Sequence, residues 1–558
     1  MTLPLPASRL RGAVRAVALG VVPTLVLGPW SAVASPGADP GTDPEVPGVA
    51  EERRAAERVL DDVEDVLARP APRRARAAVP RVDLTLQLRD LRTRLSDLGA
   101  ADRAEARALL ARPTDGYYDP EGDGYAKPKS ARNDCTVSPT PGARMCLHWV
   151  PASSEPANAP SPEDEDNDKV PDYVETARDE LDHVWRRIVT QGGYRAPLAD
   201  PGPQQGAGPD AKLDIYLTDI GDNFGLYGYC VPEFAPGGGL RAAGYCVLDN
   251  DYDPEQYGEG VDPLDNLRVT AAHEFFHAVQ FAYDYTEDPW LMEGTAAWIE
   301  DEVYDHIDDN QQFIPGGHMT HPRLPLDAPG HGSAGWYTSW TWWRYLSEVR
   351  FPEDGGTDLP LIVREVWRNA AGPRQNHSML ATARAISAAG GTFTGVFAAY
   401  GEAKRRPRAV FEEGARYRQA PVMRSFRVDG GRSTRTQTAT LPHLTSQTYT
   451  FVPGVATAAP SWRLRIPVDA PDKVRGSHTQ VSVLRDDGRR IVRQIRLNAR
   501  GKGTVVTDFS STLVDRVELT ITIASRRYKC WMGTDLACRG RSLDDGLRTT
   551  FRGVTFRG

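Results

Sequence analysis

The 558-residue sequence predicts an α+β fold in three parts that follow one another along the chain. Residues 35–130 combine a linker with helical periodicity, and residues 131–420 place short strands ahead of a long series of helices. Beyond residue 421 the helical period disappears, and short β-rich runs alternate with turns, which is typical of an all-β sandwich. A chain of this length is long enough for about two or three domains.

The first 34 residues have the pattern of a secretory signal peptide. A segment with three arginines precedes an apolar stretch at 16–30, and an Ala-Val-Ala sequence at 32–34 offers a cleavage site. Later segments fall short of the roughly 18 uninterrupted apolar residues that a membrane-spanning helix needs. We therefore expect a secreted, extracellular protein without a transmembrane segment, whose Pro- and Gly-rich residues 35–50 form a linker.

The six cysteines form three close sequential pairs, which suits an oxidising compartment. Local pairing is the simplest connectivity, and a metal site of CxxC type is not favoured because that spacing does not occur. Each short loop closed in this way would lower the freedom of the unfolded chain by about 2–3 kcal/mol. The expected disulfides are Cys135–Cys146, Cys230–Cys246 and Cys530–Cys538.

Three helices are expected in the N-terminal region. Residues 51–69 are highly charged, residues 82–98 carry leucines at alternating spacings of four and three, and residues 101–112 form a third, short helix. This region could pack on the following domain as a pro-segment. It could equally be a folded accessory bundle without a regulatory role.

The middle region is expected to begin with a mixture of strands and helices and then to continue with helices alone. Strands are expected at 145–150, 212–219 and 243–248. Helices are expected at 172–191, 267–284, from 290 onward, and at 336–349, 361–371, 378–389 and 395–405. In the last part, β-rich runs are expected at 447–452, 462–468, 479–484, 490–497, 503–508 and 517–524, and Asp486-Asp487-Gly488 indicates a hairpin.

The pentapeptide HEFFH at 273–277 predicts a metal site. Residues four apart lie on the same face of a helix, so His273 and His277 can direct both rings at one ion. Glu274 is turned by about 100° and can reach a water molecule on the ion as a general base. Glu293, sixteen residues beyond His277, falls in the first turn of the next helix and can supply a third ligand for Zn²⁺. A coincidental pattern of surface histidines is the alternative.

A second pattern suggests a structural Ca²⁺ site before the helix at 172–191. Oxygen ligands at positions 1, 3, 5, 9 and 12 match the spacing of an EF-hand loop. Lys169 occupies the sixth position, where a glycine normally makes the turn, and an acidic surface linker is the alternative. An acidic turn at 305–309 is better explained as solvated. The predicted calcium ligands are Asp164, Asp166, Asp168, Asp172 and Glu175.

The formal net charge of −9 is distributed unevenly. Residues 424–558 hold 24 Lys and Arg against 11 Asp and Glu, a net charge of +13, which leaves −22 for the rest of the chain. Solvated charge on the outer faces of a sheet is the simpler interpretation, and an anionic cell-envelope or matrix polymer as partner is the alternative. No nucleic-acid-binding motif or platform of stacking aromatic residues occurs in the sequence, so nucleic acid is not an expected partner.

The metal pattern resembles the gluzincin type of zinc peptidase, in which HExxH supplies two ligands and a base and a later glutamate supplies the third ligand. The chain is also similar, over roughly residues 145–350, to a family of secreted bacterial metalloproteases named from a myxobacterial locus. The similar segments are DNDKVPDYVE, KLDIYLTDIGDNFGLYGYC, GYCVLDNDYD, VTAAHEFFHAVQFAYD and WLMEGTAAWIEDEVYD. Two departures are the short spacer before Glu293 and Met292, where asparagine often precedes the ligand glutamate.

This resemblance implies a zincin-like metallopeptidase domain at 131–420 and a secreted zinc endopeptidase that acts on protein or peptide substrates. It also makes Tyr337 a candidate donor to the oxyanion, although a core aromatic residue is the simpler interpretation. Glu300 or Asp301 could orient a ligand imidazole. Two alternatives are a surface-binding protein that uses the basic residues 421–558 and has a vestigial metal site, and a hydrolase of non-peptide amides.

Overall fold

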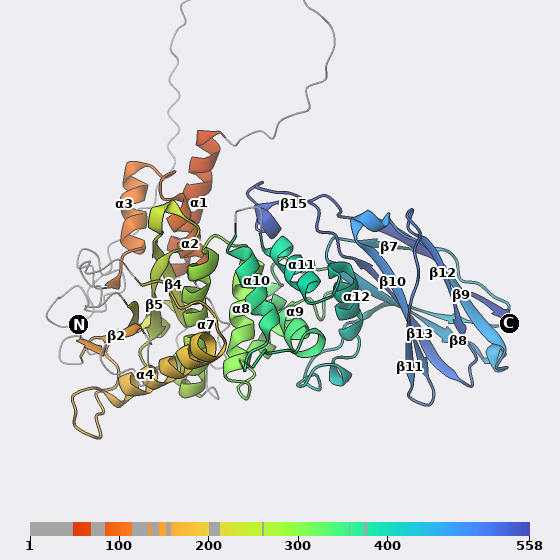
Figure 1. Ribbon diagram of the computed structural model, residues 1–558, viewed down its shortest axis with the longest axis horizontal. Coiled ribbons are helices and arrows are strands. Elements are labelled where there is room, and N and C mark those ends of the chain that lie inside the picture. The colour runs from red at the N-terminus through yellow and green to blue at the C-terminus, as the bar shows by residue number, and fades with distance from the viewer. Residues whose placement is uncertain are drawn as a thin grey trace, which may run out of the picture. The chain divides into compact units, whose positions relative to one another are not determined.

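The computed structural model describes residues 48–68, 84–113, 132–134, 144–151, 158–199, 212–258, 262–356, 358–372 and 377–558 (Figure 1). These residues form an α+β structure, as the sequence predicts. The predicted signal peptide, nearly all of the linker at 35–50, and Cys135 lie outside them. None of the helices in the described ranges is long and apolar enough to cross a bilayer.

Three helices make up the N-terminal region, α1 (Val49–Leu67), α2 (Thr85–Arg94) and α3 (Ala100–Leu109). The second helix ends earlier than the predicted span of 82–98, in a turn whose carbonyl groups accept hydrogen bonds from the Arg103 guanidinium. The leucine side chains of α2 are nevertheless buried, together with one face of α1. The apolar stripe seen in the sequence is therefore a packing surface.

A five-stranded sheet follows, in the order β1-β2-β3-β5-β4. Its strands are β1 (Arg132–Asp134), β2 (Met145–Trp149), β3 (Leu213–Thr218), β4 (Gly228–Phe234) and β5 (Ala243–Asp249). Strands β2, β3 and β5 are parallel neighbours, whereas β4 is an antiparallel edge strand. The sequence analysis did not predict β4, whose pattern is interrupted by Pro232; proline lacks an amide donor and is tolerated at an edge.

Two long buried helices lie beside this sheet. Helix α7 (Pro263–Asp284) packs on β4, β5 and α4 (Asp172–Trp185), and α8 (Pro289–Val303) packs on α7. Nearly every residue of both helices is buried, which explains why their sequences are apolar on all sides. A π-helical turn, η2 (Arg186–Gln191), continues α4.

Further helices complete the middle region. The predicted helix at 336–349 is divided into a 3-10 turn, η6 (Trp336–Ser339), an α-helical segment, α9 (Trp340–Arg344), and a π-helical segment, η7 (Tyr345–Arg350). Trp340, Trp342 and Trp343 are fully buried in the core that also contains α7 and α8, and Trp336 is half-buried against that core. The remaining helices are α10 (Leu361–Ala370), α11 (Ser378–Ala388) and α12 (Phe393–Ala403), with short helices α5 (Ile220–Phe224), α6 (Pro254–Tyr257), η3 (Pro236–Gly238), η4 (Asp309–Gly316), η5 (Gly332–Ala334) and η8 (Pro407–Ala409).

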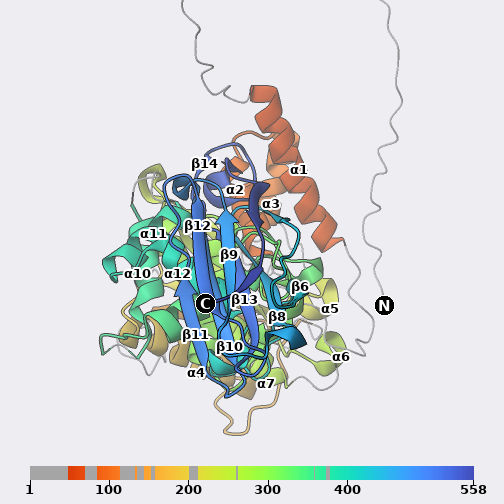
Figure 2. The same cartoon turned by 90° about the vertical axis from the view of Figure 1, so that its right-hand side faces the viewer.

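The C-terminal part contains two sheets that share one apolar core (Figure 2). The first has the order β11-β10-β13-β8-β6, and the second has the order β12-β9-β16-β7, with β17 paired to β9. Strands β6 and β8 are parallel neighbours. The predicted hairpin is confirmed, because β10 and β11 pair across it and Gly488 has φ +80°.

The bounds of these C-terminal elements are as follows: β6 (Val422–Val428), β7 (Gln437–Leu441), β8 (Thr445–Pro453), β9 (Trp462–Asp469), β10 (Ser477–Arg485), β11 (Arg490–Gln494), β12 (Lys502–Asp508), β13 (Val514–Ile523), β14 (Tyr528–Lys529), β15 (Arg541–Ser542), β16 (Leu547–Phe551), β17 (Val554–Arg557), and the turns η9 (Val455–Thr457), η10 (Lys473–Arg475) and η11 (Ala537–Arg539). Helix α12 lies against β8, β10 and β13, so the first sheet is covered on both faces. This explains why both faces of β8 are buried.

Two of the predicted disulfides are present. Cys230–Cys246 joins β4 to β5, and Cys530–Cys538 closes a short loop after β14. The backbone amides of Cys538 and Arg539 donate to the Asp288 carboxylate, at 2.7 and 3.2 Å, at the start of α8. Cys146 is also disulfide-bonded, and its predicted partner lies outside the described residues.

Candidate metal centre

The three predicted zinc ligands lie together between α7 and α8. The Nε2 atom of His273 is 3.3 Å from Oε2 of Glu293, and the Nε2 atom of His277 is 3.7 Å from the same oxygen. All three side chains are buried, and one ligand atom of each lies within 4.8 Å of the others. Glu293, the fifth residue of α8, thus directs its carboxylate to the histidine face of α7, just past the first turn in which the sequence placed it.

The other ring nitrogens show how the two imidazoles are oriented. His277 Nδ1 is 2.8 Å from Oε1 of Gln280, whose Nε2 group donates to the carbonyl of Met292. The amide oxygen of Gln280 must therefore accept from Nδ1–H, which leaves a lone pair on Nε2 of neutral His277. His273 Nδ1 likewise lies 2.5 Å from the Glu300 carboxylate, which can only accept when ionised.

This arrangement fits a metal ion. Two imidazole nitrogens that act as acceptors face the carboxylate oxygen of Glu293 in a buried site, where like partners repel unless a cation lies between them. The other oxygen of Glu293, Oε1, is buried and has no hydrogen-bond partner in the described part of the chain. Two nitrogens and one oxygen are a donor set typical of zinc sites that keep one position open.

Glu274, the predicted base, lies where the edge strand approaches α7 most closely. A Cβ atom added to Gly228 would lie 2.8 Å from Cγ and 3.1 Å from Oε1 of Glu274, so only glycine allows this approach without a shift. The Glu274 side chain is buried, and its Oε2 atom accepts a hydrogen bond from Thr85 at 3.3 Å. The predicted base is therefore covered by the N-terminal region, a contact that the sequence analysis did not foresee.

Tyr337 lies next to the metal ligands. Its ring centroid is 5.7 Å from that of His273, and the ring stacks on Phe313 at 4.6 Å. The stacking on Phe313 in η4 holds the tyrosine ring beside the histidine. Its role as a donor to the oxyanion stays a prediction.

Only part of the predicted calcium loop comes together. Carboxylate oxygens of Asp164, Asp166 and Asp168 lie within 4.8 Å of one another, whereas Asp172 and Glu175 are not part of this group. Asp172 accepts from the amide of Glu165, and Glu175 pairs with Arg178. Lys169 has φ +80°, the left-handed conformation that glycine usually adopts at this position of such a loop.

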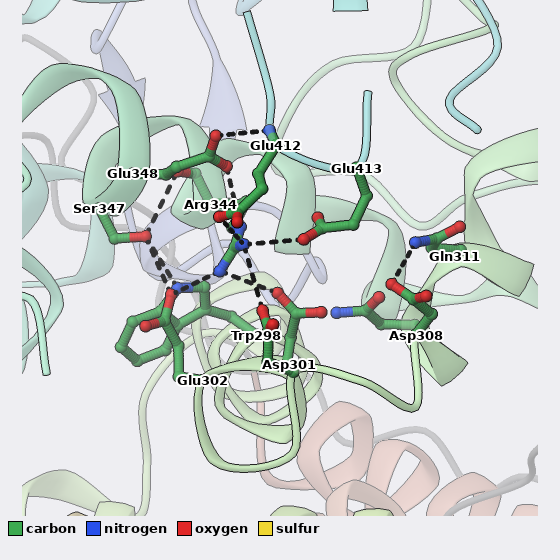
Figure 3. A network of polar contacts seen from close by, with 12 residues as sticks. Trp298, Asp301, Glu302, Asp308, Gln311, Arg344, Ser347, Glu348, Glu412 and Glu413 are labelled. Atoms are coloured by element: carbon green, nitrogen blue, oxygen red, sulfur yellow. Dashed lines mark hydrogen bonds and ion pairs between the residues drawn. The ribbon is translucent and has the colours of Figure 1, made fainter. Parts of the chain in front are cut away.

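Glu300 or Asp301 was expected to orient a ligand imidazole, and Asp301 faces a different partner. It is Glu300 that contacts the imidazole of His273, while Asp301 lies 3.0 Å from Arg344. Arg344, on α9, is a buried guanidinium surrounded by carboxylates from several elements (Figure 3). Its ion-pair partners are Asp301, Glu302, Asp305, Glu348, Glu412 and Glu413.

Burial raises the pKa values of several carboxyl groups in this Arg344 cluster. Burial raises the pKa of Asp301 to about 8, an effect that Arg344 opposes and neighbouring carboxylates increase. Burial also raises the pKa values of Glu302 and Glu348, again against the attraction of Arg344. One internal cation therefore only partly compensates the carboxylates that surround it. Sequence reasoning missed Arg344 because its partners other than Glu348 are distant in the chain.

Two other groups with metal-binding residue types are poor candidates. One combines Cys146 with His148 and Asp214, and the other combines His377 with Cys530 and Cys538. The cysteines in both groups are disulfide-bonded, so none of them can offer a thiolate. His148 is instead 2.8 Å from the Asp214 carboxylate, in agreement with a structural role.

Comparisons with known proteins add no assignment. No family model matches the chain, and no curated protein matches it. The pre-peptidase C-terminal domain of a collagenase from Bacillus anthracis is similar at 12% identity, 24% coverage of this chain and 96% of that chain, with a TM-score of 0.14. A family GH115 4-O-methyl-alpha-glucuronidase with specificity for decorated arabinogalactans is similar at 8% identity, 53% and 38% coverage, and a TM-score of 0.14. Scores this low support no argument about fold or function.

Proposed function

We propose that the protein is a secreted zinc-dependent endopeptidase with a zincin-like domain at residues 131–420. The observation that carries the proposal is the convergence of His273 Nε2, His277 Nε2 and the Glu293 carboxylate, with Glu274 on the same helix as the two histidines. The likeness of this pattern to gluzincin peptidases supports the choice of a peptide bond as substrate. The two disulfides agree with an oxidising compartment.

The residues of the site would divide the chemistry among them. His273, His277 and Glu293 would hold the ion, while Glu300 and Gln280 fix the two imidazoles through Nδ1. A zinc ion bound there supplies Lewis-acid polarisation of a carbonyl and lowers the pKa of water.

The remaining steps belong to Glu274 and Tyr337. Glu274 takes one proton from the attacking water as the new C–O bond forms, and then gives that proton to the leaving amine as the C–N bond breaks. Tyr337, beside His273, is the candidate donor to the oxyanion oxygen that develops on the substrate carbonyl. The products are a carboxylate and an amine, so water is the only co-reactant.

Metal content and activity test this proposal together. We expect one zinc per chain in the wild type and in Glu274→Gln, and loss of zinc in His277→Ala. Hydrolysis of a peptide library is measured after residues 1–113 have been cut from the rest of the chain and removed. This hydrolysis should fall by about 10²–10⁴-fold in Glu274→Gln. A matched control is Glu365→Gln, an exposed glutamate on α10, which should change neither quantity.

Three results would count against the proposal. Equal activity in the wild type and Glu274→Gln would remove the general base. Cleavage of small amides but not of peptides would favour the non-peptide hydrolase. Zinc-free, inactive protein that binds anionic polymers through residues 421–558 would favour the surface-binding alternative.

A further inference from the structure

We infer that residues 84–113 act as an intramolecular inhibitor that covers the metal centre through α2. This inference rests on the proposed function, because it concerns the regulation of the same site. It chooses between the two interpretations that the sequence leaves open for the N-terminal helices. The argument uses four sets of contacts between this segment and the residues around Glu274.

The first contact is with the predicted base itself. Thr85, the first residue of α2, is buried, and its hydroxyl accepts from the amide of Cys230 at 2.8 Å. The hydroxyl proton is therefore available for Glu274, whose Oε2 atom lies 3.3 Å away. The N-terminal end of α2 also carries a partial positive charge, which favours a carboxylate at this position. Thr85 thus offers Glu274 the hydrogen bond that a substrate water would need to make.

The second contact closes the edge of the sheet. Cys230 lies on β4, the edge strand of the order β1-β2-β3-β5-β4. An edge strand has outward amide groups that can pair with an extended peptide. Here the Cys230 amide is satisfied by Thr85. As long as α2 is in place, an extended peptide cannot use this amide next to Glu274.

The third contact fixes α2 to the turn between the two metal-bearing helices. Arg89 is buried, and its Nη1 group donates to the carbonyl of Glu287 at 2.7 Å and lies 2.8 Å from the sulfur of Met292. Met292 directly precedes Glu293, so this guanidinium contacts the side chain next to the proposed third ligand. Asp90, next in α2, pairs with both Arg89 and Arg539.

The fourth set anchors the end of the segment. Arg112 is buried and forms ion pairs with Asp214 on β3 and Glu233 on β4, and Arg92 donates to the carbonyl of Glu233. The hydroxyl of Tyr245 donates to the carbonyl of Ala111 at 2.9 Å. Apolar packing adds to these contacts, because the α2 leucines share a core with Tyr229, Val231, Tyr245 and Val247 of β4 and β5.

These contacts have one consequence for the reaction. The segment satisfies Glu274 and an edge amide with its own groups, and it buries charged side chains that would be exposed in its absence. Full-length protein is therefore a latent form, and access to Glu274 requires α2 to leave. Hydrolysis of one peptide bond between the segment and β2, with water as the only co-reactant, would allow that departure.

The test uses the full chain with a recognition sequence for a specific protease placed within residues 114–131. We expect cutting and release of residues 1–113 to raise peptide hydrolysis at least tenfold. The same recognition sequence placed within residues 201–210 is the control, and cutting there should not raise activity.

A second measurement does not depend on catalysis. The rate at which 1,10-phenanthroline removes zinc should be at least tenfold lower in the uncut chain than in the chain that has lost residues 1–113. Equal zinc-loss rates would overturn the inhibitor inference whatever the activity. Faster zinc loss after release, with no hydrolysis of any peptide, would support coverage by the segment and refute the endopeptidase instead.

Point variants test whether the inhibition depends on the hydroxyl of Thr85. Thr85→Val keeps the shape but removes the hydroxyl, so uncut Thr85→Val should show several-fold higher activity and faster zinc loss than the uncut wild type. Thr93→Val is the matched control, because the Thr93 hydroxyl donates to the carbonyl of Asp90 within α2 itself. An uncut wild type as active as the cut chain would overturn the inference.

Discussion

Helix α8 carries two buried groups of carboxylates that differ in how their charge is balanced. Glu293 and Glu300 face the histidines of α7, whereas Asp301 and Glu302 face Arg344. In the Arg344 cluster the chain supplies its own cation. At the metal centre the partners are imidazoles whose Nδ1 atoms are directed to acceptors, so the chain supplies lone pairs where a cation is needed.

The comparison teaches how to separate a structural cluster from a ligand site. Both groups are buried to a similar extent, so burial alone does not distinguish them. The difference lies in whether hydrogen-bond donors or acceptors of the chain face the carboxylates of each group. When a buried carboxylate faces a guanidinium of the same chain, the fold itself supplies positive charge against the carboxylate. When a buried carboxylate faces hydrogen-bond acceptors, its position implies a cation from outside the chain.

The largest effect should come from removing the external cation. At the proposed zinc site the ion binds the native chain and not the unfolded one, so stripping it should lower the free energy of unfolding by about 3–4 kcal/mol relative to protein in zinc at 100–1,000 times its Kd. Calorimetry at several zinc concentrations measures this, and Tm should rise with zinc. In His277→Ala the Tm should no longer depend on zinc; a retained dependence would place the ion elsewhere.

Removing the internal cation should have the next largest effect. Arg344→Met leaves buried carboxylates on α8 and η7 without their partner, which should cost about 3–5 kcal/mol of stability. Urea denaturation measures the loss, with Arg368→Met on the exposed side of α10 as control. Zinc content of the folded fraction should stay at one per chain. An equal loss in both variants would mean that the cluster does not depend on its guanidinium.

Neighbouring residues of α8 should separate the two groups. Glu300→Gln weakens the hydrogen bond that orients His273, so zinc affinity should fall about 10–100-fold. Asp301→Asn, one residue further, should leave zinc affinity unchanged because its side chain faces Arg344. Competition with a fluorescent zinc chelator gives both affinities. A similar fall in both variants would contradict the division of α8 into two faces.

The last prediction concerns the pH dependence of stability. Burial raises the pKa of Asp301 from 3.8 to about 8, so the folded chain holds a proton that the unfolded chain has lost. Stability, and Tm with it, should therefore fall as pH rises from about 4 to 8. Asp301→Asn should reduce this slope in thermal denaturation at several pH values. An unchanged slope would assign the pH dependence to other groups.

The α+β class and the positions of most helices and strands could be predicted from the sequence. Periodicity is a local property, and α7, α8 and the hairpin at Gly488 depend on local spacing. The zinc ligands could be proposed for the same reason, since two of them lie on one helix and the third begins the next. The edge strand β4 was missed because Pro232 interrupts its pattern.

Contacts between distant residues could not be predicted in this way. Thr85 and Glu274 are 189 residues apart, and Arg344 meets carboxylates from three other segments. Neither contact leaves a spacing that a sequence can show. The calcium loop stays a prediction from spacing: carboxylate oxygens of Asp164, Asp166 and Asp168 lie together, and Asp172 and Glu175 contact the Glu165 amide and Arg178.

The loop closed by Cys530–Cys538 has a consequence for dissecting the chain. The amides of Cys538 and Arg539 bind the carboxylate of Asp288, five residues before Glu293, so this C-terminal loop helps to set where the helix that carries Glu293 begins. A truncation that ends at residue 420 would leave the Asp288 carboxylate without these two amide donors. The loop closed by Cys530–Cys538 is thus better regarded as part of the scaffold of α8 than as part of a separable appendage.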